Sequence, residues 1–297
     1  MRLLITGDWH TTNKAPENRI DDFVSSLFKK IKFIAKIYKD KKCDFALQPG
    51  DFFDSPFIPY SFFASVFELL SESGLQIAAI YGQHDLRYRT KENTPLTALW
   101  ATSDFLQVIP ATGLIYNNEV AVYGASFGEE VPNFFDEGHF NVLLVHQMIV
   151  DEKLWASQEG HTLSGHFLKK HKKKFDLIVS GDNHQFFIES GKLFNMGSLM
   201  RSRIDQVDHE PSVVVFDTDT LKWERILIPV EKNVFDFSKV TSEKERDAKI
   251  EAFVEGLSET KVLGFDFEAN LRSRLREIGD EELTAFLNLC LGEIKQR

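Results

Sequence analysis

The chain has 297 residues, of which 43% are hydrophobic and 27% charged, a composition typical of a folded globular protein and not of a disordered or collagen-like chain. Asp and Glu number 45 against 35 Lys and Arg, and the net charge of −10 excludes a protein that coats nucleic acid with a globally basic surface. The net charge does not exclude a protein that binds nucleic acid through a local site or a small patch. Cys43 and Cys290 fit no zinc or disulfide pattern. The apolar runs are short, and we expect neither a signal peptide nor a membrane span. We therefore expect a cytoplasmic protein without membrane attachment.

The first hundred residues alternate short apolar runs with helical patterns. Strands are expected at residues 3–6, 45–48 and 76–81, and helices at residues 18–39 and 60–70. The first helix has an apolar stripe on one side, and we expect its lysines to form the solvated side: Lys29, Lys30, Lys32, Lys36 and Lys39. Strand, helix, strand in this rhythm predicts βαβ units and a largely parallel sheet.

After Pro110 the pattern changes to short strands separated by turns. They are expected at residues 113–116, 120–123, 141–145, 176–179, 186–189, 213–216 and 223–228, and the lysine-rich run 169–174 reads as a solvated loop. The predicted fold class is therefore α/β, a two-sheet sandwich flanked by helices. A change of composition at Pro229, followed by helical patterns at residues 241–264, 267–278 and 281–295, predicts a main domain at 1–229 and a small helical C-terminal extension at 230–297. That extension is either a cap on the protein's own core or a docking surface for a partner.

Acidic, imidazole and amide side chains follow the ends of the predicted strands. They occur in GDWH, GDFFD, GQHD, the His that ends NVLLVH, and GDNH, and comprise Asp8, His10, Asp51, Asp54, Gln83, His84, Asp85, His146, Asp182 and His184. Each alone could be ordinary turn or capping chemistry. Their recurrence at successive strand ends favours one shared site, because the carboxyl ends of parallel strands meet at one edge of a sheet. Asp and His without Cys indicate manganese, iron or zinc, and two such ions can clamp the oxygens of a phosphoryl group.

This order of motifs, DxH, GDxxD, GNHD, His and GHxH, resembles that of the calcineurin-like metallophosphoesterases over residues 1–230. Within that superfamily the chain is most similar to SbcD-type DNA repair nuclease subunits and their phage recombination-endonuclease counterparts. The similarity rests on the N-terminal GDWH, the helix after GDFFD, the NMGSLMRSR segment and the helical C-terminal extension. It implies a two-sheet metallophosphoesterase sandwich that cleaves DNA with two divalent ions, Mn²⁺ first and Mg²⁺ second. It also implies a coiled-coil ABC ATPase of the SbcC type as partner.

The resemblance assigns roles to individual residues. One ion would be held by Asp8, His10, Asp51 and His184, and the other by Asp51 as a bridge with Gln83, His146 and Asp182. His84 would be the general acid, oriented and kept protonated by Asp54, and Asp85 would have a structural role in its loop. Arg87, Arg201 and Arg203 are candidates to hold the substrate phosphate, with a solvated surface position as the alternative for each.

The resemblance also implies a homodimer through residues 57–70 and 95–103. The apolar side chains of residues 56–70 surround the predicted helix, which is therefore either buried on both sides or covered by a second copy of the chain.

Two positions depart from the family pattern and keep alternatives open. Gln83 stands where the motif has Asn, and Asp182 stands where it has the first His of GHxH. Both keep an oxygen donor, which favours manganese or magnesium over zinc at the second site. Because of these two departures, a catalytically weak scaffold subunit is one alternative to the DNA nuclease. Because the net charge is acidic, a small-molecule phosphoesterase that acts on cyclic nucleotides or phosphomonoesters is the other.

Overall fold

Two six-stranded sheets form the centre of the computed structural model, which describes residues 1–151 and 161–238. The first sheet contains, in spatial order, β14 (Trp223–Leu227), β13 (Ser212–Asp217), β1 (Arg2–Ile5), β2 (Phe45–Gln48), β3 (Ile77–Ala79) and β4 (Leu106–Val108). The second contains β11 (Phe187–Glu189), β12 (Leu193–Asn195), β10 (Leu177–Gly181), β7 (Phe140–His146), β6 (Val120–Ala125) and β5 (Leu114–Tyr116). A separate short pair is formed by β8 (Ile149–Val150) and β9 (Thr162–Leu163).

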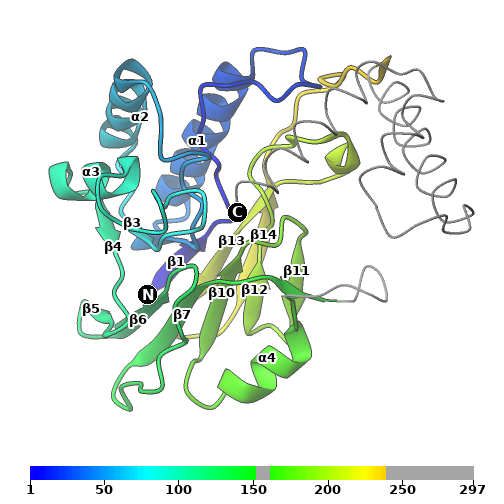
Figure 1. The fold of residues 1–297 in the computed structure, drawn as a ribbon. Helices are drawn as coiled ribbons and strands as arrows, with labels where there is room; N and C mark the ends of the chain where they lie inside the picture. The colour runs from blue at the N-terminus through cyan, green and yellow to red at the C-terminus, as the bar shows by residue number, and fades with distance from the viewer. Residues whose placement is uncertain (152–160, 239–297) are drawn as a thin grey trace, which may run out of the picture. The chain divides into compact units, whose positions relative to one another are not determined.

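Helices flank the two sheets. Within the described residues they are α1 (Phe23–Asp40), α2 (Tyr60–Ser73), α3 (Pro95–Thr102) and α4 (Ser164–His171), with a short 3-10 turn, η1, at Ile204–Gln206. Figure 1 shows α1, α2 and α3 gathered on one side of the strands and α4 on the other. The predicted α/β two-sheet sandwich is confirmed. The helices expected at residues 241–264, 267–278 and 281–295 lie outside the described residues.

The βαβ rhythm of the sequence becomes a parallel arrangement in the first sheet. β1 pairs with β2 in parallel, with Leu3 opposite Phe45, and β2 pairs with β3 and β3 with β4 in the same sense. β7 and β10 form the parallel centre of the second sheet. Because these strands run in parallel, the ends of β1, β2 and β3 reach one edge of their sheet, as the sequence predicts.

Alternate side chains of each strand enter different cores. Leu3 and Ile5 on β1 face the second sheet and pack in the core between the sheets, together with Val142 and Leu144 of β7. Leu4, between them, packs against α1, α2 and α3 instead. A third core lies between the second sheet and α4. The strands β1, β2 and β3 are thus buried on both faces, which explains why they are largely continuous apolar runs and not alternating ones.

The start of α1 differs from the prediction. The helix begins at Phe23, not at residue 18, because Asp22 caps it by accepting a hydrogen bond from the Ser25 amide at 3.0 Å. Ile20, expected on the apolar stripe, is 65% exposed, and its amide donates to the Val234 carbonyl at 3.0 Å. One of the lysines expected in solvent, Lys30, is buried.

Other elements also differ from the sequence-based expectation. The strands β4 and β12 were not expected, since each has only three residues, too few to show a period. The lysine-rich run 169–174 is not a loop throughout, because its first part ends α4.

Beyond the expected domain boundary at residue 230, Val234 and Phe235 are still buried in the compact unit Met1–Phe237. The boundary itself stays a prediction. Within the described residues, no helix has the length and apolar character needed to cross a membrane.

Most of the large apolar side chains of α2 are covered by the core of this chain, without a second copy. Phe62 and Val66 are buried, and Phe63 and Phe67 are partly buried against the same core. Tyr60, at the start of the helix, is 94% exposed. The phenylalanines along the helix therefore belong to the core at least in part, and a homodimer through residues 57–70 and 95–103 stays a prediction.

Candidate metal centre

The strand ends bring the predicted ligands together from both sheets. Asp8 follows β1, Asp51 follows β2, and His146 ends β7. Possible ligand atoms lie within 4.8 Å of one another in three groups: Asp8, His10 and His184; His10, Asp51 and His84; and Asp8, Asp51 and His146. The loops after β1 and β2 are joined directly, since the amides of Trp9 and His10 both donate to the Asp51 carbonyl, at 3.1 and 2.9 Å. Asp8, His10 and Asp51 each belong to two of the groups. Asp51 Oδ2 lies 3.7 Å from His10 Nε2 and 3.4 Å from His146 Nε2, within reach of both expected ligand sets, as a bridging ligand requires.

The backbone at this edge adopts conformations that side chains rarely tolerate. His10, Asp51 and Asp182 have φ values of 44°, 50° and 78°, in the left-handed region. Such strain collects at functional sites, where surrounding contacts hold the side chains in place. At Gly82 the need is for space, because a Cβ atom there would lie 2.1 Å from Asp51 Oδ1. Gly82 is therefore required by its close approach to the Asp51 carboxylate.

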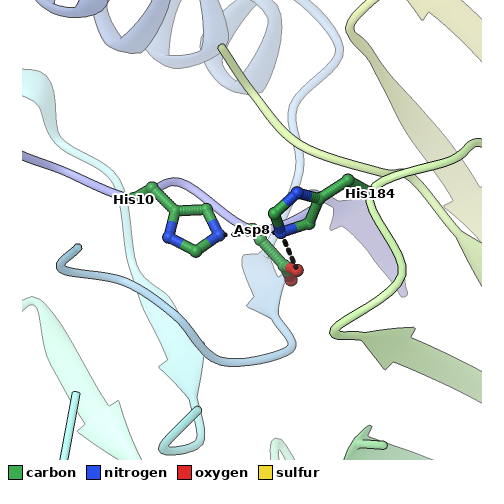
Figure 2. A group of neighbouring side chains, drawn as sticks. All are labelled: Asp8, His10 and His184. Carbon is green, nitrogen blue, oxygen red and sulfur yellow. Dashed lines mark hydrogen bonds and ion pairs between the residues drawn. The ribbon is translucent and has the colours of Figure 1, made fainter. Parts of the chain in front are cut away.

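The first group joins a buried carboxylate to two imidazoles (Figure 2). Asp8 is fully buried; its Oδ2 accepts from the Asp182 amide at 2.9 Å and lies 3.8 Å from His184 Nε2. Its Oδ1 makes no hydrogen bond among the described residues. The Nε2 atoms of His10 and His184 lie 3.0 Å apart. Burial and the nearby His10 lower the pKa of His184 to about 4, which keeps this ring in the neutral form that binds metals.

The third group is built around His146. Its Nδ1 lies 2.7 Å from the Pro49 carbonyl, and its Nε2 lies 2.6 Å from Gln83 Oε1 and 3.4 Å from Asp51 Oδ2. Burial acts to lower the pKa of His146, but the hydrogen bond with Asp51 and the charges of Asp8 and Asp51 outweigh it and raise the pKa to about 10. Gln83 Nε2 donates to Asp182 Oδ1 at 2.8 Å. All four residues expected around the second ion are therefore in one place.

These donors fit two divalent ions. The buried Oδ1 of Asp8 has no protein donor to satisfy it among the described residues, and such an atom costs free energy unless a cation or donor reaches it. Carboxylates, imidazoles and an amide are the ligand types that manganese and related ions accept. The geometry supports the ligand roles proposed for Asp8, His10, Asp51, Gln83, His146, Asp182 and His184, which stay predictions.

His84, which belongs to the second group, and Asp54 lie at the solvent side of the site. His84 Nδ1 lies 2.9 Å from the Asp54 main-chain carbonyl and 3.8 Å from its carboxylate Oδ1. That carboxylate is closer to His10, at 3.3 Å from Nδ1, and the hydrogen bond with His10 lowers the pKa of Asp54. Since a carbonyl can only accept, His84 carries its proton on Nδ1 in this arrangement. Asp54 therefore orients His84 through its main chain more than through its charge.

Asp85 joins the loops that follow β2 and β3. Its carboxylate is fully buried and accepts from the amides of Phe52, Phe53 and Gly82, at 3.1, 2.8 and 3.0 Å. Burial and the charge of Asp51 raise its pKa to about 7. These contacts agree with the structural role expected for Asp85, because its carboxylate fixes the loop carrying Asp51 to the loop carrying His84.

The three candidate arginines lie in different surroundings. Arg87 lies over the ring of Phe57, with 4.9 Å from its Cζ to the ring centroid. Arg201 donates to the main-chain carbonyls of Val207 and Glu231, so these donors are engaged within the protein. Arg203 is exposed and lies 3.6 Å from Asp205. Phosphate binding by Arg87, Arg201 and Arg203 stays a prediction.

Removal of metal by a chelator is expected to destabilise the protein more at about pH 8.5 than at about pH 5. In the metal-free protein burial raises the pKa of Asp8 from 3.8 to about 7, so stability falls as the pH rises through that range. The pKa of His146 is raised from 6.5 to about 10, so the stability that its charge contributes is complete below pH 6.5 and lost as the pH rises through 10. Ligand binding needs the opposite forms, an ionised Asp8 and a neutral His146. Melting temperatures with manganese and with chelator at both pH values test this; equal differences would contradict it.

A two-sheet α/β sandwich with Asp and His gathered from its strand ends defines the class: a metal-dependent phosphoester hydrolase. The calcineurin-like phosphoesterase family matches residues 1–186, and the chain belongs to that family. No curated protein matches the chain.

Solved structures resemble this fold at low sequence identity. The protein TT1561 of Thermus thermophilus is 14% identical with a TM-score of 0.49, over 77% of this chain and 99% of the other. A putative 5'-nucleotidase from Staphylococcus aureus, in complex with alpha-ketoglutarate, is 14% identical with a TM-score of 0.48, over 82% of this chain and 57% of the other.

Proposed function

We propose that this protein is a two-metal phosphodiesterase that cleaves DNA, the nuclease subunit of a recombination or repair complex. The observation that carries the choice of DNA over a small substrate is an exposed aromatic edge, formed by Phe57, Tyr88 and Arg87, which follow Asp54 and His84 closely along the chain. Phe57 and Tyr88 are 56% and 81% exposed, and their ring centroids lie 6.5 Å apart. Arg87 lies 4.9 Å from the first ring and 5.5 Å from the second.

The aromatic edge is close to the centre along the chain. Phe57 follows Asp54, and Tyr88 follows His84, by three and four residues, so each Cα lies within about 11 to 14 Å of the Cα of its site residue. Tyr88 and Arg89 have φ values of 52° and 62°, a conformation that a bulky side chain adopts only at a cost. Exposed rings beside a cation provide the stacking surface and positive charge that bind unpaired bases and their phosphates.

The chemistry follows from the residues around the centre. Two divalent ions, held by the ligands named above, would lower the pKa of water and polarise the phosphoryl oxygens. His84, on the solvent side of the ligand groups, donates a proton to the leaving oxygen, and the Asp54 carbonyl orients its ring. Asp85 holds the loops that carry these groups. Manganese is the proposed ion and magnesium the second choice, because Asp182 adds a carboxylate.

Replacing Phe57 and Tyr88 together by Ala is expected to raise the KM for single-stranded DNA about tenfold or more, since stacking contributes about 1 to 3 kcal/mol per base. The kcat/KM for bis-p-nitrophenyl phosphate should change much less, because this substrate has two small rings and no run of bases to stack on the edge. Manganese-dependent cleavage of labelled DNA gives the measurement, and Phe135→Ala, another exposed aromatic, is the control.

The same assay separates DNA from the alternative substrates. A wild type that hydrolyses the small diester and cyclic nucleotides but leaves DNA intact would identify a small-molecule phosphoesterase. Failure to hydrolyse any of them with manganese bound would support the scaffold alternative. The coiled-coil ABC ATPase partner and the homodimer are part of the proposal, and the acidic net charge is consistent with DNA being delivered by such a partner.

A further inference from the structure

A short stretch of backbone joins two of the proposed ligands. This segment, residues 197–199, lies in the NMGSLMRSR region after β12. The Asp8 amide donates to the Gly197 carbonyl at 3.1 Å, and the Leu199 amide donates back to the Asp8 carbonyl at 2.8 Å. The Ser198 amide donates to the His184 carbonyl at 3.4 Å. The backbone positions of Asp8 and His184 thus depend on the position of segment 197–199.

Two side chains hold the segment from the other side. His209 Nε2 lies 2.7 Å from the Ser198 carbonyl, and Lys30 Nζ donates to the Leu199 carbonyl at 3.0 Å. Because a carbonyl can only accept, His209 carries a proton on Nε2. Lys30 comes from α1 and His209 from the loop after η1, so the segment is anchored to two separate parts of the fold.

The packing around the segment is tight. A Cβ atom on Gly197 would lie 2.5 Å from the His184 carbonyl oxygen and 3.0 Å from His209 Cε1. The ring of His209 therefore lies directly against the segment, close to the ligand His184. A small displacement of the ring or the segment would be passed on to the ligand backbone, because packed interiors leave no room to absorb it.

Burial of Lys30 is unfavourable by itself. The side chain is buried, and burial together with Arg201 and Arg19 lowers its pKa to about 7. A buried amine needs a partner, and the partner of its Nζ is the Leu199 carbonyl. An apolar side chain at this point of α1 would extend the core without that cost. Lys30 therefore contributes a hydrogen bond to segment 197–199, which offsets the cost of burying its amine.

We propose that His209 and Lys30 are positioning residues of the metal centre, which hold segment 197–199 so that Asp8 and His184 are aligned for one ion. Their hydrogen bonds are to main-chain carbonyls of segment 197–199, so they act through the backbone that both ligands share. The inference rests on the metal centre of the proposed function, but not on DNA as the substrate. Partners of this kind, outside the ligands themselves, commonly change metal affinity about 10- to 100-fold when they are removed.

The test compares two replacements of His209. Gln places an amide nitrogen near the position of Nε2 and can keep the hydrogen bond, whereas Asn is too short to reach the Ser198 carbonyl. We expect His209→Asn to weaken one of two manganese-binding steps about tenfold or more, and His209→Gln to stay close to the wild type. Titration calorimetry and the electron paramagnetic resonance of bound manganese give the affinities. His166→Asn, at an exposed position of α4, is the matched control.

Further measurements keep the test decisive. The melting temperature of each chelated variant separates positioning from folding, and Lys30→Met replaces the donor with an apolar chain and serves if His209→Asn does not fold. A selective loss of one binding step in a folded variant supports the inference. Wild-type affinities in folded His209→Asn and Lys30→Met proteins would overturn it. Failure of the wild type itself to bind manganese would overturn the metal centre and this inference together, whereas manganese binding without DNA cleavage would overturn only the choice of substrate.

Discussion

Replacing His84 by Ala is expected to reduce DNA cleavage by about 10²- to 10⁴-fold while both manganese ions stay bound. The ring has one nitrogen fixed by the Asp54 carbonyl at 2.9 Å, and 42% of its side chain is exposed at the solvent side of the centre. In its doubly protonated form, a ring held in this way can give the Nε2 proton to the leaving oxygen of a phosphodiester and keep the proton on Nδ1. Without it the deoxyribose oxygen must leave as an alkoxide, which is a far poorer leaving group.

A substrate with a better leaving group gives the control for His84. p-Nitrophenolate leaves without help from an acid, so His84→Ala should lose much less activity on bis-p-nitrophenyl phosphate than on DNA. The ratio of the two rates is the measurement, with manganese content determined on the same samples. Equal losses on both substrates, together with loss of an ion, would mean that His84 is a ligand, as its nearness to His10 and Asp51 allows.

Replacing Asp51 by Asn is expected to lower activity about a thousandfold or more, because metal ions supply several kcal/mol of transition-state stabilisation. Asp51 Oδ2 lies 3.7 Å from His10 Nε2 and 3.4 Å from His146 Nε2, within reach of both proposed ligand sets. The substitution removes the charge but keeps an oxygen at Oδ1, which accepts from the His84 amide at 2.8 Å. The loop can therefore keep its conformation. Loss of the charge should also lower the pKa of Asp8, which Asp51 helps to raise.

Metal analysis and circular dichroism distinguish the outcomes for Asp51→Asn. We expect a folded protein with less than the wild-type manganese content, and Asp104→Asn, at an exposed position, as an unaffected control. An Asp51→Asn protein that is folded, fully loaded with manganese and active would show that Asp51 does not bridge the two ions. The assignment of both ligand sets would then have to be redrawn.

The strand-end positions of Asp8, Asp51 and His146 could be predicted from the sequence. Buried parallel strands are continuous apolar runs, and their carboxyl ends share an edge whatever the rest of the chain does. The convergence of these side chains is therefore a consequence of local pattern and sheet direction. Membership of the phosphoesterase family followed from the same motifs.

Contacts between the motifs could not be predicted in this way. The pairing of Asp54 with His84 was expected through the carboxylate, but the main-chain carbonyl is closer and the carboxylate lies nearer to His10. The start of α1 was also misplaced, because the Asp22 cap begins the helix although the apolar period continues back to Ile20. In both cases the arrangement depends on a hydrogen bond of about 3 Å, and the spacing of residues in the sequence does not show which of the possible partners forms that bond.

Local sequence pattern determined which strands form, which residues end them, and hence the kind of chemistry that gathers at their edge. Only the tertiary structure decided which other side chains position the backbone that carries these residues. Lys30 belongs to a run of lysines that periodicity places in solvent, yet its amine reaches a carbonyl 169 residues away and is buried there. The physical reason is that burial of a polar group depends on whether a distant partner satisfies it, and no local period carries that information.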